Sequence, residues 1–200
     1  MGDRGTKNPA GDATSYVVNA IRGVGDVASA IVDATSDVIV HTLKGTRATG
    51  SELRGIITGT ITGTIHGVYL VGGEVESAAS SIMVGALRGT KQVGKAGADA
   101  VSTCASALVS GAADVGSDVG RTAKGAVEGA IKGARDVGLT SEQAASAAAS
   151  GALKAAGEIS SAALDQVRKV TAKTISGVKI VGAETFRPEE PDSERRHPAA

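Results

Sequence analysis

Few side chains in this sequence are of the types that carry chemistry, and their spacing builds no recognisable site. Cys104 is the single cysteine, which excludes an internal disulfide and a zinc site made of cysteines. It lies beside Ala105, and we expect it to be a small buried apolar residue. His41 and His66 stand 25 residues apart, both at polar positions of the helical pattern described below. We therefore expect solvated histidines and no shared metal ion.

The segment GSDVGRTAKG at residues 116–125 has the glycines, lysine and hydroxyl groups of a phosphate-binding loop. Such a loop follows a strand, whereas the residues before this segment have a helical pattern. No nucleophile is paired with a general base in the sequence, and paired carboxylates fall on the polar face of a helix. The sequence therefore predicts a protein that is not an enzyme, with no cofactor, no metal ion and no small-molecule substrate.

The composition limits both the core and the partner. Among 200 residues there are no Trp, one Phe and two Tyr, so the apolar side chains are those of Ala, Val and Ile. This shortage of large side chains argues against a tightly packed interior. The 21 basic residues balance 21 acidic ones, which argues against a nucleic-acid partner because that partner needs a basic surface. The first residues lack the apolar segment of a secretory signal, so we expect a cytoplasmic location.

The elements that must position these residues follow from the prolines and from the spacing of charges. The four prolines lie at residue 9 and at or after residue 188, so nothing in the middle of the chain forbids helix. When the chain is written in columns of eleven, 28 of the 31 charged residues between residues 16 and 186 fall in five columns. With eleven residues per three turns, those columns form one arc of an amphipathic helix.

We therefore expect an all-α fold: a long amphipathic helix, or a helical hairpin or bundle, over residues 14–186. Residues 1–13 and the charged, proline-containing tail at 187–200 are expected to be disordered. Helix stop and start signals in VGLTSEQ predict a break at 138–141, and TGSELRG predicts a weaker one at 50–51.

A doubled period of 22 residues runs through this helical region. Glycine-bracketed segments such as GARDVG recur at that spacing, so the chain reads as a series of 22-residue units. One set of repeat glycines is Gly45, Gly67, Gly89, Gly111, Gly133 and Gly177.

This glycine content makes an isolated helix unstable. The 25 glycines between residues 16 and 186 oppose helix formation by roughly 12 to 25 kcal/mol relative to alanine, so the apolar face must be covered by lipid or by protein. The residues expected to face the lipid or the partner are Val71, Ile82, Val93, Leu108, Val115, Val119 and Val137. The basic residues expected at the boundary of that stripe are Lys91, Lys124 and Arg135.

The run GTKQVGKAGADAVSTCASALVSGAADVGSDVGRTAKGAVEGAIKGARDVG, residues 89–138, resembles the repeat regions of perilipins and, more loosely, of synucleins. The shared features are eleven-residue units rich in Gly, Thr, Val, Ala and Lys. The resemblance extends over about residues 20–182. It implies long amphipathic helices that coat lipid droplets or vesicles.

Three functions are compatible with these patterns. The first is a non-enzymatic coat on a lipid surface such as a droplet, a storage granule or a curved membrane, with the protein peripheral on that surface. The second is a self-assembling helical bundle or right-handed coiled coil, in which the apolar stripes bury one another and the partner is the chain itself. The third is a glycine-zipper membrane protein, in which residues 55–73 pack through glycines spaced four residues apart.

Overall fold

Short helices succeed one another along almost the whole of the chain that the computed structural model describes, which comprises residues 9–22, 26–44, 50–172, 175, 177–178 and 180. The odd-numbered helices are α1 (Pro9–Arg22), α3 (Ser51–Leu70), α5 (Ala98–Asp114) and α7 (Ser141–Ile159). The even-numbered helices are α2 (Val27–Leu43), α4 (Val75–Gln92), α6 (Val119–Gly133), which continues into the 3₁₀ helix η1 (Ala134–Val137), and α8 (Ser161–Thr171). An isolated antiparallel bridge between Ile175 and Val178 follows α8.

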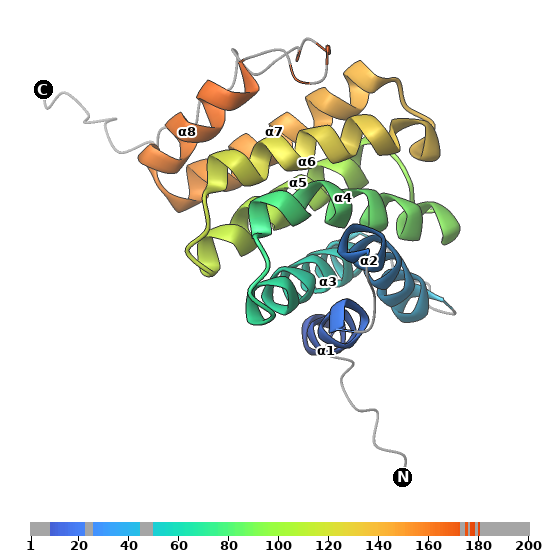
Figure 1. Ribbon diagram of the computed structural model, residues 1–200. Coiled ribbons are helices and arrows are strands. Elements are labelled where there is room, and N and C mark those ends of the chain that lie inside the picture. Colours follow the sequence, from blue (N-terminus) through green and yellow to red (C-terminus); the bar gives the residue numbers. More distant parts are fainter. Residues whose placement is uncertain are drawn as a thin grey trace, which may run out of the picture.

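The helices form two rows that pack against each other (Figure 1). The odd helices make one row, in which α1 packs on α3, α3 on α5 and α5 on α7. The even helices make the other row in the same way, from α2 to α8. Each helix also contacts the helix that follows it in the chain, which joins the two rows. The result is a stack in which each helix packs mainly on its first and second neighbours along the chain.

Glycines in the left-handed conformation end several of these helices. Gly72, Gly94, Gly116 and Gly138 have φ between 67° and 75°. After each one, the next residue donates its backbone N–H to a carbonyl in the last turn of the helix, as in the bond of 2.8 Å from Gly73 to Val68. This arrangement caps the free carbonyls of a helix end, and it favours glycine because other residues are strained at positive φ. The chain therefore turns at these points, which lie 22 residues apart.

Four of the helices, α2, α6, α7 and α8, begin with a side chain that caps their backbone N–H groups. Asp26, Asp118, Thr140 and Ser160 each accept a hydrogen bond from the backbone N–H three residues later. At α7, the Gln143 side chain also accepts a hydrogen bond of 3.0 Å from the backbone N–H of Thr140, which completes a capping box.

The all-α prediction is confirmed for the described residues, but no long uninterrupted helix is found among them. The chain turns at both predicted breaks, since α3 begins at Ser51 and α7 at Ser141. It also turns at places where an unbroken helix was expected, such as between α3 and α4. The first described helix, α1, begins at Pro9, and proline is well suited to the first turn of a helix. The predicted tail at 187–200, Gly45 and residues 1–8 lie outside the described residues.

The expectation of a poorly packed interior was wrong. One continuous core runs through the stack, and most of its side chains are fully buried alanines, valines and isoleucines. Glycines make this possible, because they let helix backbones in the same row approach closely. Gly129 of α6, for example, packs so tightly on α4 that a Cβ added to it would lie 2.6 Å from the Ser80 carbonyl oxygen. Small residues therefore fill the interior by bringing helices together rather than by extending side chains between them.

These close contacts also give the relative direction of the helices in a row. Along α6, Gly125, Gly129 and Gly133 face Ala79, Met83 and Leu87 of α4 in that order. Both sets of residue numbers rise together, so α4 and α6 are parallel. Helices of the same row thus point the same way and the two rows point in opposite directions. The turns from α3 to α4, α5 to α6 and α7 to α8 consequently lie on one edge of the stack, and the turns from α4 to α5 and from α6 to α7 lie on the other (Figure 1).

Candidate interaction edges

The residues whose side chains could take part in chemistry lie apart from one another in the structure. Cys104 is fully buried in α5, and burial raises the pKa of its thiol to about 12. His41 lies in a groove at the α1–α2 end of the stack, whereas His66 is half-buried on α3. Among the described residues, no group of three or more His, Cys, Asp or Glu side chains is placed to hold a metal ion.

The segment 116–125 is a turn followed by the start of α6 rather than a phosphate-binding loop. Asp118 occupies the position an anion would take, since its Oδ1 accepts a hydrogen bond of 2.9 Å from the backbone N–H of Arg121. Lys124 lies 3.6 Å from Glu128 Oε1 on the same helix. The protein's own carboxylates therefore neutralise this segment.

A groove of about 670 Å³ lies between α1 and α2 at the N-terminal end of the stack. Its polar wall includes Asp12, Tyr16, Asp37, His41 and Lys44. The Tyr16 hydroxyl donates a hydrogen bond of 3.3 Å to Asp37 Oδ2, and the negative charge of that carboxylate raises the pKa of the tyrosine. The wall mixes acids and bases around a neutral phenol and pairs no nucleophile with a base, so we see no catalytic arrangement in it.

The predicted apolar stripe faces the interior of the stack. Ile82 and Leu108 are fully buried, and Val119 and Val137 are 8% exposed. The remaining three stripe residues are half-buried and lie at helix C-caps: Val71 caps α3, Val93 caps α4 and Val115 caps α5. Of the predicted boundary residues, Lys91 forms an ion pair of 3.1 Å with Asp136, Lys124 pairs with Glu128, and Arg135 is exposed.

Four of the repeat glycines lie at contacts between helices of the same row. Gly67 packs on α1, Gly89 on α2, Gly111 on α3 and Gly133 on α4. Gly177 differs, because it has φ of 79° in the short segment after α8. Neither the sequence period nor the glycine count revealed that the contact is made with the helix two places earlier in the chain.

The edge with the even-to-odd turns is rich in basic side chains. We call it the basic edge, and its exposed cations are Lys44, Arg54, Arg88, Lys91, Lys95, Lys132 and Arg135. Acids are interspersed there, namely Glu52, Asp99, Asp136 and Glu142. Part of this pattern stabilises helices, because α2, α4 and α6 end here and a basic residue in a last turn interacts favourably with the helix dipole.

The opposite edge, with the odd-to-even turns, is rich in acids. We call it the acidic edge, and its carboxylates are Asp26, Glu74, Glu76, Asp114, Asp118 and Glu158, accompanied by Arg22 and Arg121. Helix stability explains the acids at the starts of α2, α4 and α6. It does not explain Asp114 and Glu158, which lie at the C-terminal ends of α5 and α7, where an acid is unfavourable.

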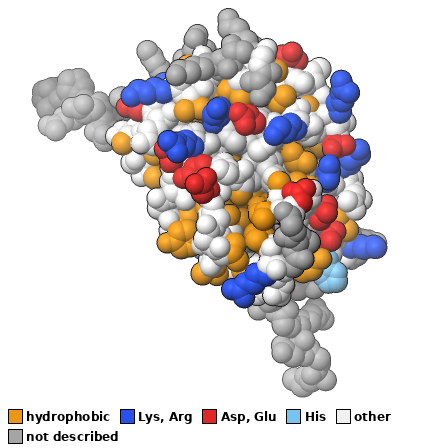
Figure 2. Space-filling model, viewed as in Figure 1, with side chains coloured by type: hydrophobic (Ala, Val, Ile, Leu, Met, Phe, Trp, Pro, Cys, Tyr) orange, Lys and Arg blue, Asp and Glu red, His pale blue; other side chains and the backbone are white. Residues whose placement is uncertain are grey.

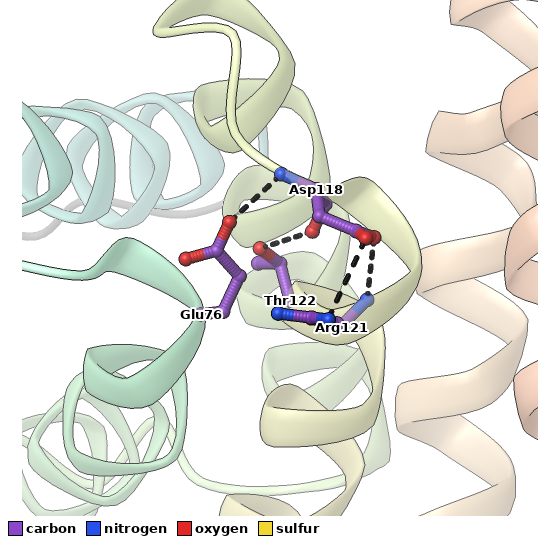
Figure 3. Close-up of polar contacts among 4 residues, drawn as sticks. All are labelled: Glu76, Asp118, Arg121 and Thr122. Carbon is purple, nitrogen blue, oxygen red and sulfur yellow. Dashed lines mark hydrogen bonds and ion pairs between the residues drawn. The ribbon is translucent and has the colours of Figure 1, made fainter.

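Glu76 ties two helix starts together on the acidic edge (Figure 3). Its Oε1 accepts a hydrogen bond of 2.9 Å from the backbone N–H of Asp118, the residue that caps α6. Thr122 also donates its hydroxyl to the Asp118 carbonyl oxygen at 2.9 Å. Glu76 is one of the three charges that depart from the eleven-residue register, and this role explains the departure. The position of Glu76 outside the eleven-residue register was the sequence signal that could have identified this role.

Exposed large apolar side chains concentrate on the acidic edge. Tyr69 and Leu70, at the end of α3, are 54% and 65% exposed, and Val27 and Ile159 are also exposed at helix ends on this edge. On the face seen in Figure 2, apolar side chains gather at the lower left, toward the α3–α4 turn, and Lys and Arg side chains lie along the right margin with Asp and Glu side chains among them. The two edges therefore differ in charge and in apolar character.

No helix among the described residues has both the length and the hydropathy needed to cross a membrane. This includes α3, which holds most of the 55–73 window. Comparison of the chain with protein-family models, with curated proteins and with solved structures gives no match.

Proposed function

We propose that the protein is a non-enzymatic structural protein, a rigid stack of short helices that holds two differently charged edges apart. In this proposal the 22-residue unit is one helix with one turn, and successive units alternate between the two rows. The observation that carries it is the burial of Ile82, Leu108, Val119 and Val137 within the chain's own core. A chain that covers its own apolar stripe needs no lipid to become helical.

The spacing of the turn glycines supports the repeat unit. Gly72, Gly94, Gly116 and Gly138 recur every 22 residues and each ends a helix. Repeats that contact only their neighbours build elongated bodies whose surfaces serve for binding. The described residues offer grooves of mixed polarity but no converging catalytic groups, which favours a binding or structural role over catalysis.

Circular dichroism of the full chain with and without a lipid emulsion tests this proposal. We expect high helicity in buffer, a cooperative thermal transition and no increase in helicity when the emulsion is added. Low helicity in buffer that rises strongly with lipid would overturn the proposal.

A second candidate is the lipid coat that the resemblance to perilipins and synucleins implies, reached by opening the stack onto a lipid surface. The composition of the core favours it, because a core of alanine, valine and glycine contacts buries little apolar area per residue and is weakly held. Opening would transfer the stripe from the core to lipid with the charged arc facing water. In the same experiment, this candidate predicts loss of the thermal transition in the presence of emulsion, with helicity retained.

A further inference from the structure

We propose that the acidic edge of one copy docks on the basic edge of a second copy, with Leu70 inserted into the groove between the starts of α3 and α5. The inference rests on the proposed function, because it requires the folded stack. It adds a partner, a site on each edge and a mode of assembly.

The inserting residue is unusually exposed for its size. Leu70 is 65% exposed and Tyr69, beside it, is 54% exposed, both in the last turn of α3. The last turn of α3 carries no basic residue, as is also true of α5 and α7, although a basic residue there would favour helix stability. Tyrosine is among the residue types that anchor interfaces, and the exposed leucine beside it adds apolar area that docking would bury.

The receiving groove lies on the opposite edge and has a volume of about 370 Å³. Leu53, Ile57, Ala98 and Ala100 supply its apolar lining. An apolar cavity of about 150 Å³ already accepts benzene, so this groove has room for one large side chain. It is open at the surface and thus accessible to a residue of another molecule.

Charges around the two sites are complementary. Arg54 and Lys95 line the groove and are exposed, with Asp99 as an acid in the same wall. On the edge that carries Leu70, the exposed acids nearest in the fold are Glu74, at the start of α4, and Asp114, at the end of α5. Bases lie among them, since Arg22 ends α1 beside α3 and Arg121 lines a groove with Glu74. Gly111 faces Ile65, which sets the end of α5 beside the end of α3. Docking would therefore bring two acids toward two bases, which also explains an acid at the unfavourable C-terminal end of α5.

The geometry makes the association head-to-tail. Because the inserting residue and the groove lie on opposite edges, each copy in a pair retains one unused site, and further copies can add in the same direction. The expected product is a concentration-dependent series of oligomers rather than a closed dimer.

Sedimentation velocity of the full chain tests the proposal. The wild-type protein should associate more as its concentration rises and less as salt is added, because salt screens exposed charges. Leu70→Ser should weaken the association by about tenfold or more, as truncation of an anchor residue does. The double variant Arg54→Glu, Lys95→Glu should do the same from the other side. Ile159→Ser removes an exposed apolar residue from the same edge, away from the contact, and should leave the association unchanged.

Mixing the two defective proteins gives the sharpest result. The Leu70→Ser protein keeps a working groove, and the Arg54→Glu, Lys95→Glu protein keeps a working Leu70. An equimolar mixture should therefore form one-to-one dimers that grow no further. A mixture that stays monomeric, although each variant is folded by circular dichroism, would overturn the head-to-tail contact.

Two other outcomes also overturn the proposal. One is a wild-type protein that is folded but monomeric at every concentration and salt level, a result that leaves the proposed function intact. The other is flotation of the wild-type chain with neutral phosphatidylcholine vesicles that Leu70→Ser abolishes without changing sedimentation, which assigns Leu70 to a lipid surface. An unfolded wild-type chain in buffer would instead refute the proposed function itself.

Discussion

Two groups of glycines recur along the chain, and a Cβ added to each group meets a different environment. At the turn glycines Gly72, Gly94, Gly116 and Gly138, no heavy atom lies within 4 Å of the added Cβ, but φ is positive. At the interior glycines such as Gly129 and Gly151, φ is helical and the added Cβ meets the backbone of another helix. The first group is glycine for its conformation and the second for its size.

This difference changes how the glycine content of the chain is understood. If all glycines lay in one long helix, each would only lower helix stability. In the stack, the turn glycines are not in helix interiors, and several interior ones allow backbone contacts that a larger residue would prevent. The helical propensity lost at those positions is offset by closer packing of the two helices.

The largest effect is expected where an added methyl group meets backbone. Gly151 of α7 lies against the Ser102 carbonyl group of α5, so Gly151→Ala must push the two helices apart. Overpacking of this kind costs about 1 to 3 kcal/mol, and because each kcal/mol shifts the melting temperature of a chain of this length by about 2 to 4 °C, the melting temperature should fall by roughly 2 to 12 °C. Because Cys104 is on α5, its buried thiol should also react faster with a thiol reagent in this variant.

Gly157→Ala in the same helix is the matched control, since a Cβ there meets nothing within 4 Å. We expect it to keep the wild-type melting temperature or to raise it slightly, with Cys104 still protected. Equal melting temperatures for the two variants would show that α5 and α7 are not in close backbone contact.

A smaller loss is expected at a turn glycine. Gly116 has φ of 72° and open space around the Cβ position, so Gly116→Ala should cost only the strain of the left-handed conformation, about 1 kcal/mol. Gly116→Asn should recover part of this loss, because asparagine tolerates that conformation better than alanine. Urea unfolding of the three proteins measures the difference. A gain in stability from alanine would mean that the helix continues through this residue.

The smallest effect, and one of opposite sign, is expected at Gly55 in α3. Its φ is helical and a Cβ there meets no atom within 4 Å, so Gly55→Ala should stabilise the protein by about 0.5 to 1 kcal/mol. Thermal unfolding followed by circular dichroism is sufficient to detect the rise. A loss of stability would show that Gly55 lies in a contact with another helix, as the interior glycines Gly129 and Gly151 do.

The fold class and the two strongest turn signals could be predicted from the sequence, whereas the number of turns could not. The eleven-residue register does not separate a continuous helix from a stack, because a 22-residue unit contains two elevens and keeps the same register through every turn. Only VGLTSEQ carried both a helix stop and a helix start that are recognisable by residue type. At Gly72 the Gly-Gly pair of GVYLVGGE is a helix-stop signal, but no capping side chain marks the start of α4, whose N-cap residue Glu74 makes no side-chain cap.

The candidate interaction edges were also beyond the sequence, for a topological reason. Asp114 and Glu158 lie far from Leu70 in the chain and share an edge with it only because same-row helices are parallel. The sequence pattern groups the stripe residues as an apolar set but does not identify what covers them, since burial against protein and burial against lipid select the same side chains. The identity of the covering surface was the missing information.

The packing of helices mainly on first and second neighbours has one more consequence, which concerns length. Segments far apart in the sequence do not have to contact each other in the stack, so the packing itself sets no fixed number of helices. Removing α5 and α6 together, two consecutive units, would bring α4 before α7 with every remaining helix in its original direction, and it would remove one turn from each edge. Duplicating the same pair would extend both edges equally. The length of the stack should therefore change in steps of one helix pair, and after the deletion α3 would have to pack on α7 and α4 on α8.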